Sequence, residues 1–323
     1  MATYEQIKTL IKYHYDNDQN GFYTTALQIA AYEAKNGHEK FANDIKKLID
    51  KKQKENNIKI IANVNDFSDL VIVQKSDYKM NNLIVNANIK LKLNRIIDEY
   101  KLQSKIKKYG LDNRRKLLLS GQPGVGKTLS ASVIAGELSL PLHIVMIDKI
   151  ITKYFGETSA KLRKIFDLLY DRRAVYLFDE FDAIGAERNL NNDIGEIRRV
   201  LNSFLQFIEQ DKSNSIIVAA TNNPKILDQA LYRRFDDIIY YSLPSNEEIK
   251  LLINYRLGDF KPNKLSFAKI LERTKKLSHA EIVYACDNAI KEAILNDRRT
   301  ITQSSLIKMI EERKNSYKFK DKK

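Results

Sequence analysis

The sequence predicts an α/β fold, in which helices cover both faces of a parallel sheet of five strands and helices alone precede and follow it. Three observations support this prediction. Short apolar runs alternate with helical patterns between residues 116 and 241, which is typical of parallel sheets with crossover helices. Only helical patterns occur from Ser245 onward. Residues 1–55 contain three amphipathic helical stripes.

The composition is that of a globular protein. The chain has 323 residues, of which 43% are hydrophobic and 30% are charged, so it can bury a substantial core. No apolar run approaches the ~20 residues that span a bilayer, and no secretory signal is visible before Leu10. Cys286 is the only cysteine, so no intrachain disulfide can form, and we expect this thiol to be a small core residue. These observations favour a cytoplasmic protein.

The formal net charge of +14 raises the question of an anionic partner. The lysines are spread along the helical segments and do not gather with aromatic residues, as they would on a nucleic-acid-binding surface. Binding of nucleic acid is therefore the weaker interpretation of this charge.

The first segment, residues 1–55, is predicted to be a small antiparallel helical bundle. Apolar residues recur at helical spacing in three stretches, and Asn36-Gly37 stops the second of them. Such a bundle can hold a partner helix in a groove, or it can simply bury its own stripes, and the sequence favours neither. Residues 56–84 are predicted to be a connector, with strand-like composition at Leu70-Val71-Ile72-Val73.

The remaining elements follow in order. A helix is expected over 88–108 and ends before Gly110, and strands are expected over 116–120, 142–147, 174–178, 215–220 and 237–241. Helices are expected over 129–138, 159–170, 194–209, 246–257, 265–277, 279–296 and 302–313. We therefore expect a large α/β domain over 85–243, a helical domain over 244–313 and a basic tail over 314–323.

One loop carries a phosphate-binding pattern. Residues 121–128 read GQPGVGKT and fit G-x-x-x-x-G-K-[ST], between a predicted strand and a predicted helix. In this motif the glycines let backbone N–H groups turn toward a phosphate chain, and the positive end of the helix points the same way. We expect Lys127 to reach the β- and γ-phosphates of a nucleotide and Thr128 to hold Mg²⁺. The predicted nucleotide contacts are Gly121, Gln122, Pro123, Gly124, Val125, Gly126, Lys127, Thr128 and Leu129.

Two carboxylates follow the apolar strand over 174–178. Asp179 and Glu180 stand where neighbouring parallel strands present their carboxyl ends to a ligand. We assign Asp179 to Mg²⁺, through its water shell, and Glu180 to orienting and polarising the attacking water.

Together these segments resemble an AAA ATPase of the classical clade, which includes microtubule-severing, endosomal-sorting, proteasomal and membrane-protease ATPases. The resemblance covers residues 65–312, with residues 121–128 as the Walker A motif and residues 175–180 as the Walker B motif. Gln122 and Val125 replace the Pro and Thr that are common in the former. The resemblance implies a phosphate-loop NTPase fold with a helical lid, ATP hydrolysis with Mg²⁺, and a homo-oligomeric ring, typically a hexamer.

The resemblance assigns further residues. Asn222, after the strand over 215–220, corresponds to the sensor-1 residue that holds the attacking water or the γ-phosphate. Arg233 and Arg234 correspond to the arginine fingers, which stabilise charge on the ATP of the adjacent subunit. The alternative for these arginines is a surface ion pair with Asp236 or Asp237.

A channel loop is also implied. Tyr154, Phe155 and Gly156 match the aromatic-hydrophobic-glycine pore loop with which the family grips an extended polypeptide. Without the resemblance, the two aromatic residues would be interpreted as core anchors. A second channel loop is implied, on fewer residues, within 186–195.

The last implied segment lies in the lid. Residues 277–282, LSHAEI, resemble the sensor-2 segment, with His279 in place of the usual Gly and without the sensor Arg. Other classical-clade members also lack that Arg, so hydrolysis is still expected. How His279 or Ala280 meets the adenine or ribose is left open by the resemblance.

Three functions compete on this evidence. The leading hypothesis is a ring-forming ATPase that remodels, unfolds or disassembles protein substrates by threading them through a central pore. The alternatives are an ATP-dependent switch or adaptor that recruits a partner through the N-terminal bundle, and an ATPase stimulated by nucleic acid. A partner protease is also compatible with the family, and because H-E-x-x-H is absent, proteolysis of that type would belong to another chain.

Overall fold

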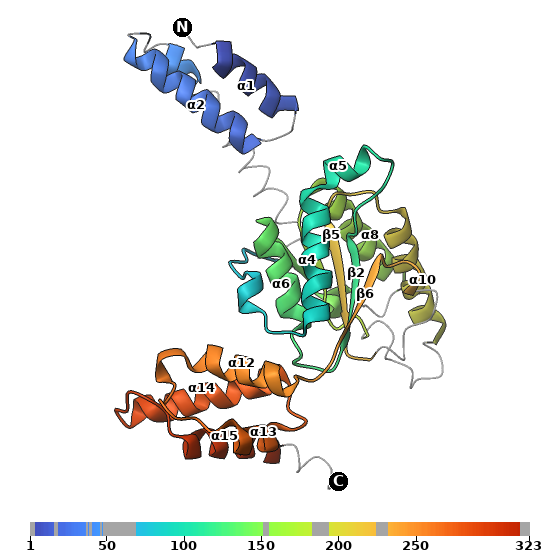
Figure 1. Ribbon diagram of the computed structural model, residues 1–323. Coiled ribbons are helices and arrows are strands. Elements are labelled where there is room, and N and C mark those ends of the chain that lie inside the picture. The colour runs from blue at the N-terminus through green and yellow to red at the C-terminus, as the bar shows by residue number, and fades with distance from the viewer. Residues whose placement is uncertain are drawn as a thin grey trace. The chain divides into compact units, whose positions relative to one another are not determined.

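The computed structural model describes residues 4–15, 19–36, 38, 41–45, 47, 69–150, 155–182, 194–223 and 232–316. The chain divides into two compact units, Met1–Ser68 and Asp69–Lys323 (Figure 1).

The described part of the first unit is helical. α1 (Tyr4–Tyr15) packs against α2 (Gln19–Lys35), and residues 41–45 form a further helical stretch. α2 begins at Gln19, inside the stretch 17–21 where the sequence pattern predicts a break. Leu48 and Ile49, from the third predicted stripe, lie outside the described residues. Among the described residues of this unit, the buried apolar side chains are Ala26, Ile29, Ala30 and Ala42, and Thr25 and Glu33 are buried beside them.

A six-stranded sheet forms the centre of the second unit. Its strands are β1 (Val71–Gln74), β2 (Lys116–Gly121), β3 (Leu142–Val145), β4 (Val175–Phe178), β5 (Ile216–Thr221) and β6 (Asp237–Tyr241). Their order across the sheet is β1-β3-β4-β5-β2-β6. The strands from β2 to β6 pair in parallel, which confirms the predicted α/β fold with five parallel strands.

The sixth strand, β1, was not part of the predicted sheet. It pairs antiparallel with β3 at the edge of the sheet, with Val71 opposite Val145. It lies within the range predicted as a connector, where an apolar run of four residues could not be assigned a partner from the sequence. Because β1 is an edge strand, only Val71 is buried and the next three residues are exposed.

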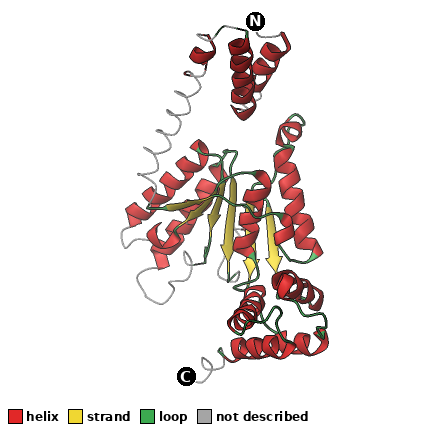
Figure 2. Cartoon of the chain, turned by 90° about the vertical axis from the view of Figure 1, so that its left-hand side faces the viewer, coloured by secondary structure: helices red, strands yellow, loops and turns green. Residues whose placement is uncertain are grey.

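Helices flank the sheet on both faces (Figure 2). α4 (Ala87–Lys101) and α6 (Lys127–Leu138) contact each other and share one core with the sheet. Leu117 and Leu119 of β2 point into this core. α5 (Gln103–Lys107) follows α4 after a break at Leu102, where the sequence predicts one helix over 88–108. The short helices in this region are η1 (Met80–Asn82) and α7 (Ile147–Ile150).

The other face of the sheet is covered by α8 (Phe155–Asp171) and α10 (Ile194–Gln210), which contact each other. Phe178 of β4 packs between Phe166 of α8 and Phe204 of α10, with ring centroids 6.2 and 5.1 Å away. Burial on both faces explains why β4 reads as an uninterrupted apolar run, VYLF, and has no polar alternation.

Four helices and one 3₁₀ turn form the C-terminal segment: α12 (Asn246–Leu257), η3 (Gly258–Phe260), α13 (Phe267–Thr274), α14 (His279–Leu295) and α15 (Gln303–Asn315). They enclose a core of their own around Ile253, Ile282 and Cys286. Capping boxes begin α12, at Ser245, and α14, at Ser278. Burial raises the pKa of Cys286 to about 12, in agreement with the predicted core thiol. No described helix is long and apolar enough to cross a membrane.

Candidate functional site

The glycine loop joins β2 to α6 in the backbone conformation that a phosphate cradle requires. Gly124 and Gly126 have φ angles of +75° and +100°, which L side chains rarely adopt. Gly126 is the N-cap of α6, and no side chain caps this end of the helix. The N–H groups of the first turn of α6 therefore remain available to an anion, at the positive end of the helix dipole.

Lys127 lies at the centre of the site. Its ammonium group donates hydrogen bonds to the carbonyl oxygens of Gly121 and Gln122, at 2.8 and 2.9 Å, and to Oδ1 of Asn222, at 2.8 Å. Burial lowers the pKa of Lys127, while the carboxylates of Asp179 and Asp182 oppose that change. The contact to Asn222 joins the glycine loop to the carboxyl end of β5, the strand next to β2.

Thr128 and Asp179 bring a hydroxyl group and a carboxylate together. Thr128 Oγ1 donates to Asp179 Oδ2 at 2.6 Å, although the two residues are 51 positions apart in the chain. Oxygen donors of this kind, which keep room for water, are the ligands that Mg²⁺ prefers, usually together with substrate phosphates. The pair beside the glycine loop therefore fits Mg²⁺ bound to a nucleotide.

Glu180 is held in an unusual backbone conformation. Its φ angle is +50°, and its N–H donates to Asp179 Oδ1 at 2.9 Å. A positive φ is uncommon outside glycine, and strain of this kind is concentrated at functional sites. The next residue, Phe181, is fully buried and donates its N–H to the carbonyl oxygen of Ala220. The backbone on both sides of Glu180 is therefore fixed, while its carboxylate is exposed at the cavity.

Asn222 is held from two sides. Its side chain accepts from Lys127, and its backbone N–H donates to Asp182 Oδ1 at 3.2 Å. Asp182 thus supports the predicted sensor residue, a role that the sequence analysis did not assign. Its position two residues after Glu180, in the turn that follows β4, is the signal that could have indicated it.

The glycine loop borders a cavity of about 390 Å³. One end carries the polar residues Lys127, Thr128, Asp179, Glu180 and Asn222. The rest of the wall comes from residues 82–84 and from the helices α12 and α14. Its apolar side chains, which the sequence analysis missed, are Leu83, Ile84, Leu252 and Val283. Leu83 and Ile84 lie far from Leu252 and Val283 in sequence, and only the apolar run at 83–85 could have drawn attention to any of the four.

The lid contacts the glycine loop directly. The N–H of Ala280, in the first turn of α14, donates to the carbonyl oxygen of Gly124 at 2.9 Å. Asn82 Nδ2 donates to the hydroxyl group of Tyr255 on α12 at 2.8 Å. The predicted sensor-2 segment therefore lies against the phosphate loop, and both are part of the cavity wall.

The two predicted arginine fingers lie at the opposite end of the sheet. Arg233 and Arg234 precede β6, whose first residue, Asp237, pairs with Leu117 near the start of β2. The glycine loop follows the other end of β2, a strand of six residues that is about 20 Å long. Neither arginine can therefore complete the site of its own chain.

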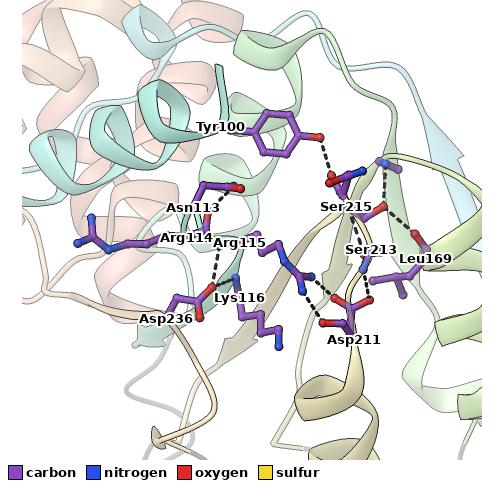
Figure 3. Close-up of polar contacts among 12 residues, drawn as sticks. Tyr100, Asn113, Arg114, Arg115, Lys116, Leu169, Asp211, Ser213, Ser215 and Asp236 are labelled. Atoms are coloured by element: carbon purple, nitrogen blue, oxygen red, sulfur yellow. Dashed lines mark hydrogen bonds and ion pairs between the residues drawn. The ribbon is translucent and has the colours of Figure 1, made fainter. Parts of the chain in front are cut away.

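The alternative partners of these arginines are engaged elsewhere. Asp236 Oδ2 accepts from the backbone N–H groups of Arg115 and Lys116, at 2.8 and 2.9 Å (Figure 3). Asp237 forms an ion pair with Lys92 at 2.8 Å. Arg234 instead pairs with Glu209 at 3.2 Å, and Arg233 is exposed, with no ion-pair partner among the described residues.

A second contact stabilises the end of the sheet at which β2 begins. The guanidinium group of Arg115 pairs with the buried carboxylate of Asp211, which also accepts from the backbone N–H of Ser213 (Figure 3). The segment that carries Arg233 and Arg234 is thus attached, through Asp236, to a strand end that is itself fixed.

Only part of the predicted pore loop lies among the described residues. Tyr154 lies outside the described residues, and Phe155 and Gly156 are the first two residues of α8. Most of the second candidate loop also lies outside them, because the description resumes at Ile194.

Comparisons with known proteins agree with this site. The profile of the family described as "ATPase family associated with various cellular activities (AAA)" matches residues 117–243. The chain is 31% identical over 310 residues to an uncharacterized AAA family ATPase of Sinorhizobium fredii, covering 94% of this chain and 93% of that protein. It is 34% identical over 210 residues to the proteasome-activating nucleotidase of Pyrococcus furiosus, covering 62% and 53% of the two chains. It is 31% identical over 246 residues to the ATP-dependent zinc metalloprotease FtsH of Mycoplasmopsis synoviae, covering 74% of this chain and 36% of that one.

Proposed function

This chain belongs to the AAA ATPase family, and we propose that it acts as a homo-oligomeric ring, of six subunits as is typical of the family, which hydrolyses ATP to remodel protein substrates. The observation that carries the proposal is the placement of the site residues at two opposite ends of one sheet. The phosphate loop and both carboxylates lie at one end, and the exposed Arg233 lies at the other.

Different residues at the phosphate loop would bind the phosphates of ATP, the Mg²⁺ ion and the attacking water. The N–H groups of residues 124–129 and the ammonium group of Lys127 hold the phosphates of ATP, and Thr128 and Asp179 hold Mg²⁺. The bound ion supplies positive charge that stabilises the transferring phosphoryl group. Glu180 accepts a hydrogen bond from the attacking water, and Asn222 orients that water or the γ-phosphate.

The separation of the two arginines from the phosphate loop of their own chain supports the ring. Arg233 and Arg234 would stabilise the charge that develops on the phosphoryl oxygens of the adjacent subunit's ATP. Asp236, through its two backbone hydrogen bonds, fixes the segment that presents them. Arg234 must give up its pair with Glu209 to act in this way, and the exposed carboxylate of Glu209 makes that pair a weak one.

The remodelling role rests on the pore loop and on the relatives. Tyr154, Phe155 and Gly156 would grip an extended polypeptide in the channel, where aromatic contact tolerates many sequences. Relatives whose names include a proteasome-activating nucleotidase and an ATP-dependent protease favour a protein substrate. The chain spans about half of the former and a third of the latter, so any proteolytic partner is a further proposal.

We also propose the division of labour along the chain. Residues 1–55 would bind a partner or substrate. Of the predicted connector over 56–84, the part from Asp69 belongs to the ATPase unit, because β1 pairs with β3 and residues 82–84 line the cavity. Together with 85–243 and the lid over 244–313, this part would bind and hydrolyse ATP. The basic tail covers 314–323. A cytoplasmic location fits this role.

The proposal is tested by measuring which polymer stimulates ATP hydrolysis. We expect casein, as an unfolded protein, to raise the steady-state rate of the wild-type chain, and we expect Tyr154→Ala to abolish the stimulation while basal hydrolysis remains. Salt-sensitive stimulation by DNA and not by casein would contradict the proposal in favour of a nucleic-acid-dependent ATPase. Unchanged stimulation by casein in Tyr154→Ala would favour a switch that recruits its partner through the N-terminal bundle.

A further inference from the structure

A buried pair of hydroxyl groups joins the last residue of β6 to the fourth residue of α6. Tyr241 Oη donates a hydrogen bond to Ser130 Oγ at 2.7 Å, although the two residues are 111 positions apart in the chain. Tyr241 is 5% exposed and Ser130 is fully buried. Neither residue lines the nucleotide cavity, and neither belongs to a motif that the sequence analysis recognised. The pair therefore has a role other than direct contact with a ligand.

The hydroxyl group of Tyr241 is a fixed donor. The residue belongs to the core between the sheet and the helices α4 and α6, which also contains Ile239 and Ala131. A hydroxyl group in such surroundings needs a hydrogen-bond partner. Burial raises the pKa of Tyr241, so the group stays protonated and donates to Ser130.

Ser130 passes this restraint to the glycine loop. Its Oγ donates to the carbonyl oxygen of Gly126 at 2.9 Å, and its backbone N–H donates to the same oxygen at 2.9 Å. A serine that bonds back to the carbonyl four residues earlier is common in helices. Here the hydroxyl group also accepts from Tyr241, which fixes its orientation. Two donors therefore hold the Gly126 oxygen, and one of them depends on the tyrosine.

The carbonyl oxygen of Gly126 determines where the N–H of Lys127 points. The two groups belong to one planar trans peptide unit, in which C=O and N–H point in opposite directions. Holding the oxygen toward Ser130 therefore turns the N–H of Lys127 toward the open N-terminus of α6, where phosphates would bind. Gly126 has a φ of +100°, and because glycine restrains its own backbone least, an external restraint matters here.

Tyr241 also contacts the other end of the glycine loop. The register of β2 and β6 places Gly121, the first residue of the loop, opposite Tyr241. A Cβ at Gly121 would lie 2.5 Å from the carbonyl oxygen of Tyr241. Tyr241 thus meets the first glycine of the loop through its backbone and the last glycine through Ser130.

We propose that Tyr241 is a positioning residue of the nucleotide site, which orients the N–H of Lys127 toward the phosphates through Ser130 and Gly126. The inference rests on the proposed function in that the glycine loop binds a nucleotide. It adds a residue from β6 to a site whose other polar groups come from β2, α6 and the ends of β4 and β5.

The test measures the affinity of the full chain for ADP and for tripolyphosphate by calorimetry, in wild type, Tyr241→Phe, Ser130→Ala and the double variant. We expect Tyr241→Phe to weaken both ligands by about fivefold, the effect of one hydrogen bond, because both bind through their phosphates. Ser130→Ala should weaken both at least as much. The double variant should bind no more weakly than Ser130→Ala, because the tyrosine acts only through the serine.

Tyr176→Phe is the matched control. Tyr176 is fully buried in β4, and its hydroxyl group donates to the carbonyl oxygens of Leu168 and Arg172, each at 3.0 Å. It does not line the cavity. Because the control also loses a buried hydroxyl group, it should lower the Tm of the ligand-free chain about as much as Tyr241→Phe does. Its affinity for both ligands should remain that of the wild type.

Three results would overturn the inference. Wild-type affinity in Tyr241→Phe, with a Tm lowered as in the control, would show a purely structural role, while ADP binding by the wild type would leave the proposed function intact. A loss in the double variant equal to the product of the two single losses would show that Tyr241 does not act through Ser130. A loss with ADP but not with tripolyphosphate would assign the effect to the nucleoside. Absence of ADP binding in the wild type would instead refute the proposed function on which the inference rests.

Discussion

Asp179 and Glu180 are adjacent carboxylates with different surroundings. Asp179 accepts from the hydroxyl group of Thr128 and from the backbone of Glu180, so both of its oxygens are engaged. Glu180 is exposed at the cavity on a backbone with positive φ. This difference fits the proposed roles, in which Asp179 holds a metal ion and Glu180 acts on water.

We predict that Glu180→Gln keeps ATP binding and reduces the rate of hydrolysis by at least about 100-fold, because an amide cannot accept the proton of the attacking water. Binding is measured by equilibrium titration and turnover by phosphate release. Glu272→Gln, the same change at an exposed position of α13, is the control and should retain turnover. Full turnover in Glu180→Gln would show that another group activates the water.

His143 provides a residue-scale test of pH dependence. It is buried in β3, its ring lies edge-on to Tyr176 at 4.7 Å, and burial lowers its pKa to about 4 from an ordinary value of 6.5. The unfolded chain therefore takes up a proton near pH 6.5, whereas the folded chain does so only near pH 4. Stability from this residue is complete above pH 6.5 and is lost as the pH falls toward 4.

We predict that lowering the pH reduces the free energy of unfolding more in wild type than in His143→Gln. Between pH 7.5 and pH 5 the difference should be about 2 kcal/mol, from a pKa of 6.5 unfolded and about 4 folded. Urea unfolding at the two pH values provides the measurement. Parallel pH dependence in the two proteins would contradict a neutral buried His143.

At the residue scale, the sequence predicted those site residues that stand in a motif or directly after a recognisable strand. The motif over 121–128 and the carboxylates after β4 are adjacent in the chain or follow a recognisable strand. Asp182, Leu83 and Leu252 were missed, because each reaches the site only through tertiary packing and none stands in a chemical pattern.

At the scale of elements, the contact between the glycine loop and α14 depends on the absence of a side chain at Gly124. A Cβ there would lie 2.7 Å from Ser278 Oγ and 3.1 Å from the Cβ of Ala280. The hydrogen bond from Ala280 to the Gly124 carbonyl requires this close approach. The lid can therefore lie against the phosphate loop only if residue 124 is glycine.

We predict that Gly124→Ala weakens ADP binding by at least about tenfold, because it separates α14 from the loop and strains the phosphate cradle. Gly110→Ala is the matched control, since Gly110 has a similar φ of +73° but nothing within 4 Å of an added Cβ. Both changes should cost about 1 kcal/mol of stability from the left-handed backbone, and only the first should affect ADP. Equal affinity in the two variants would show that the contact with the lid is not needed for binding.

The sequence predicted most accurately the strands that are buried on both faces and the helices with clear end signals. β4 and β5 are buried on both faces and appear as unbroken apolar runs, and α12 begins and ends at the predicted residues. β1 could not be placed, because a four-residue edge strand shows its role only in pairing with β3. The break at Leu102 between α4 and α5 has no Gly or Pro to signal it.

At the scale of the whole molecule, the order of the strands separates the two halves of the proposed active site. β2 and β6 are parallel neighbours, so the loop after β2 and the segment before β6 must lie at opposite ends of the sheet. This follows from topology and holds whatever the side chains do. The sequence motifs predicted both halves, but the distance between them required the register of the strands.

The first unit adds a surface that the ATPase chemistry does not use. Tyr4, Ile7 and Ile11 of α1 are 83%, 49% and 51% exposed and recur at helical spacing. The sequence predicted helices here, yet neither it nor the described part of this unit identifies a ligand. The assignment of residues 1–55 to partner binding therefore stays a prediction.

The central claim is that two chains share each active site, and mixed variants test it most directly. The measurement is ATP hydrolysis against protein concentration for wild type, Arg233→Ala, Lys127→Ala and an equimolar mixture of the two variants. We predict that the wild-type specific activity rises cooperatively with concentration, that each variant alone is nearly inactive, and that mixing restores part of the activity. In the mixture, an intact phosphate loop from one chain can meet an intact Arg233 from the other. A specific activity that is independent of concentration, with Arg233→Ala as active as wild type, would show that one chain completes its own site and would contradict the account.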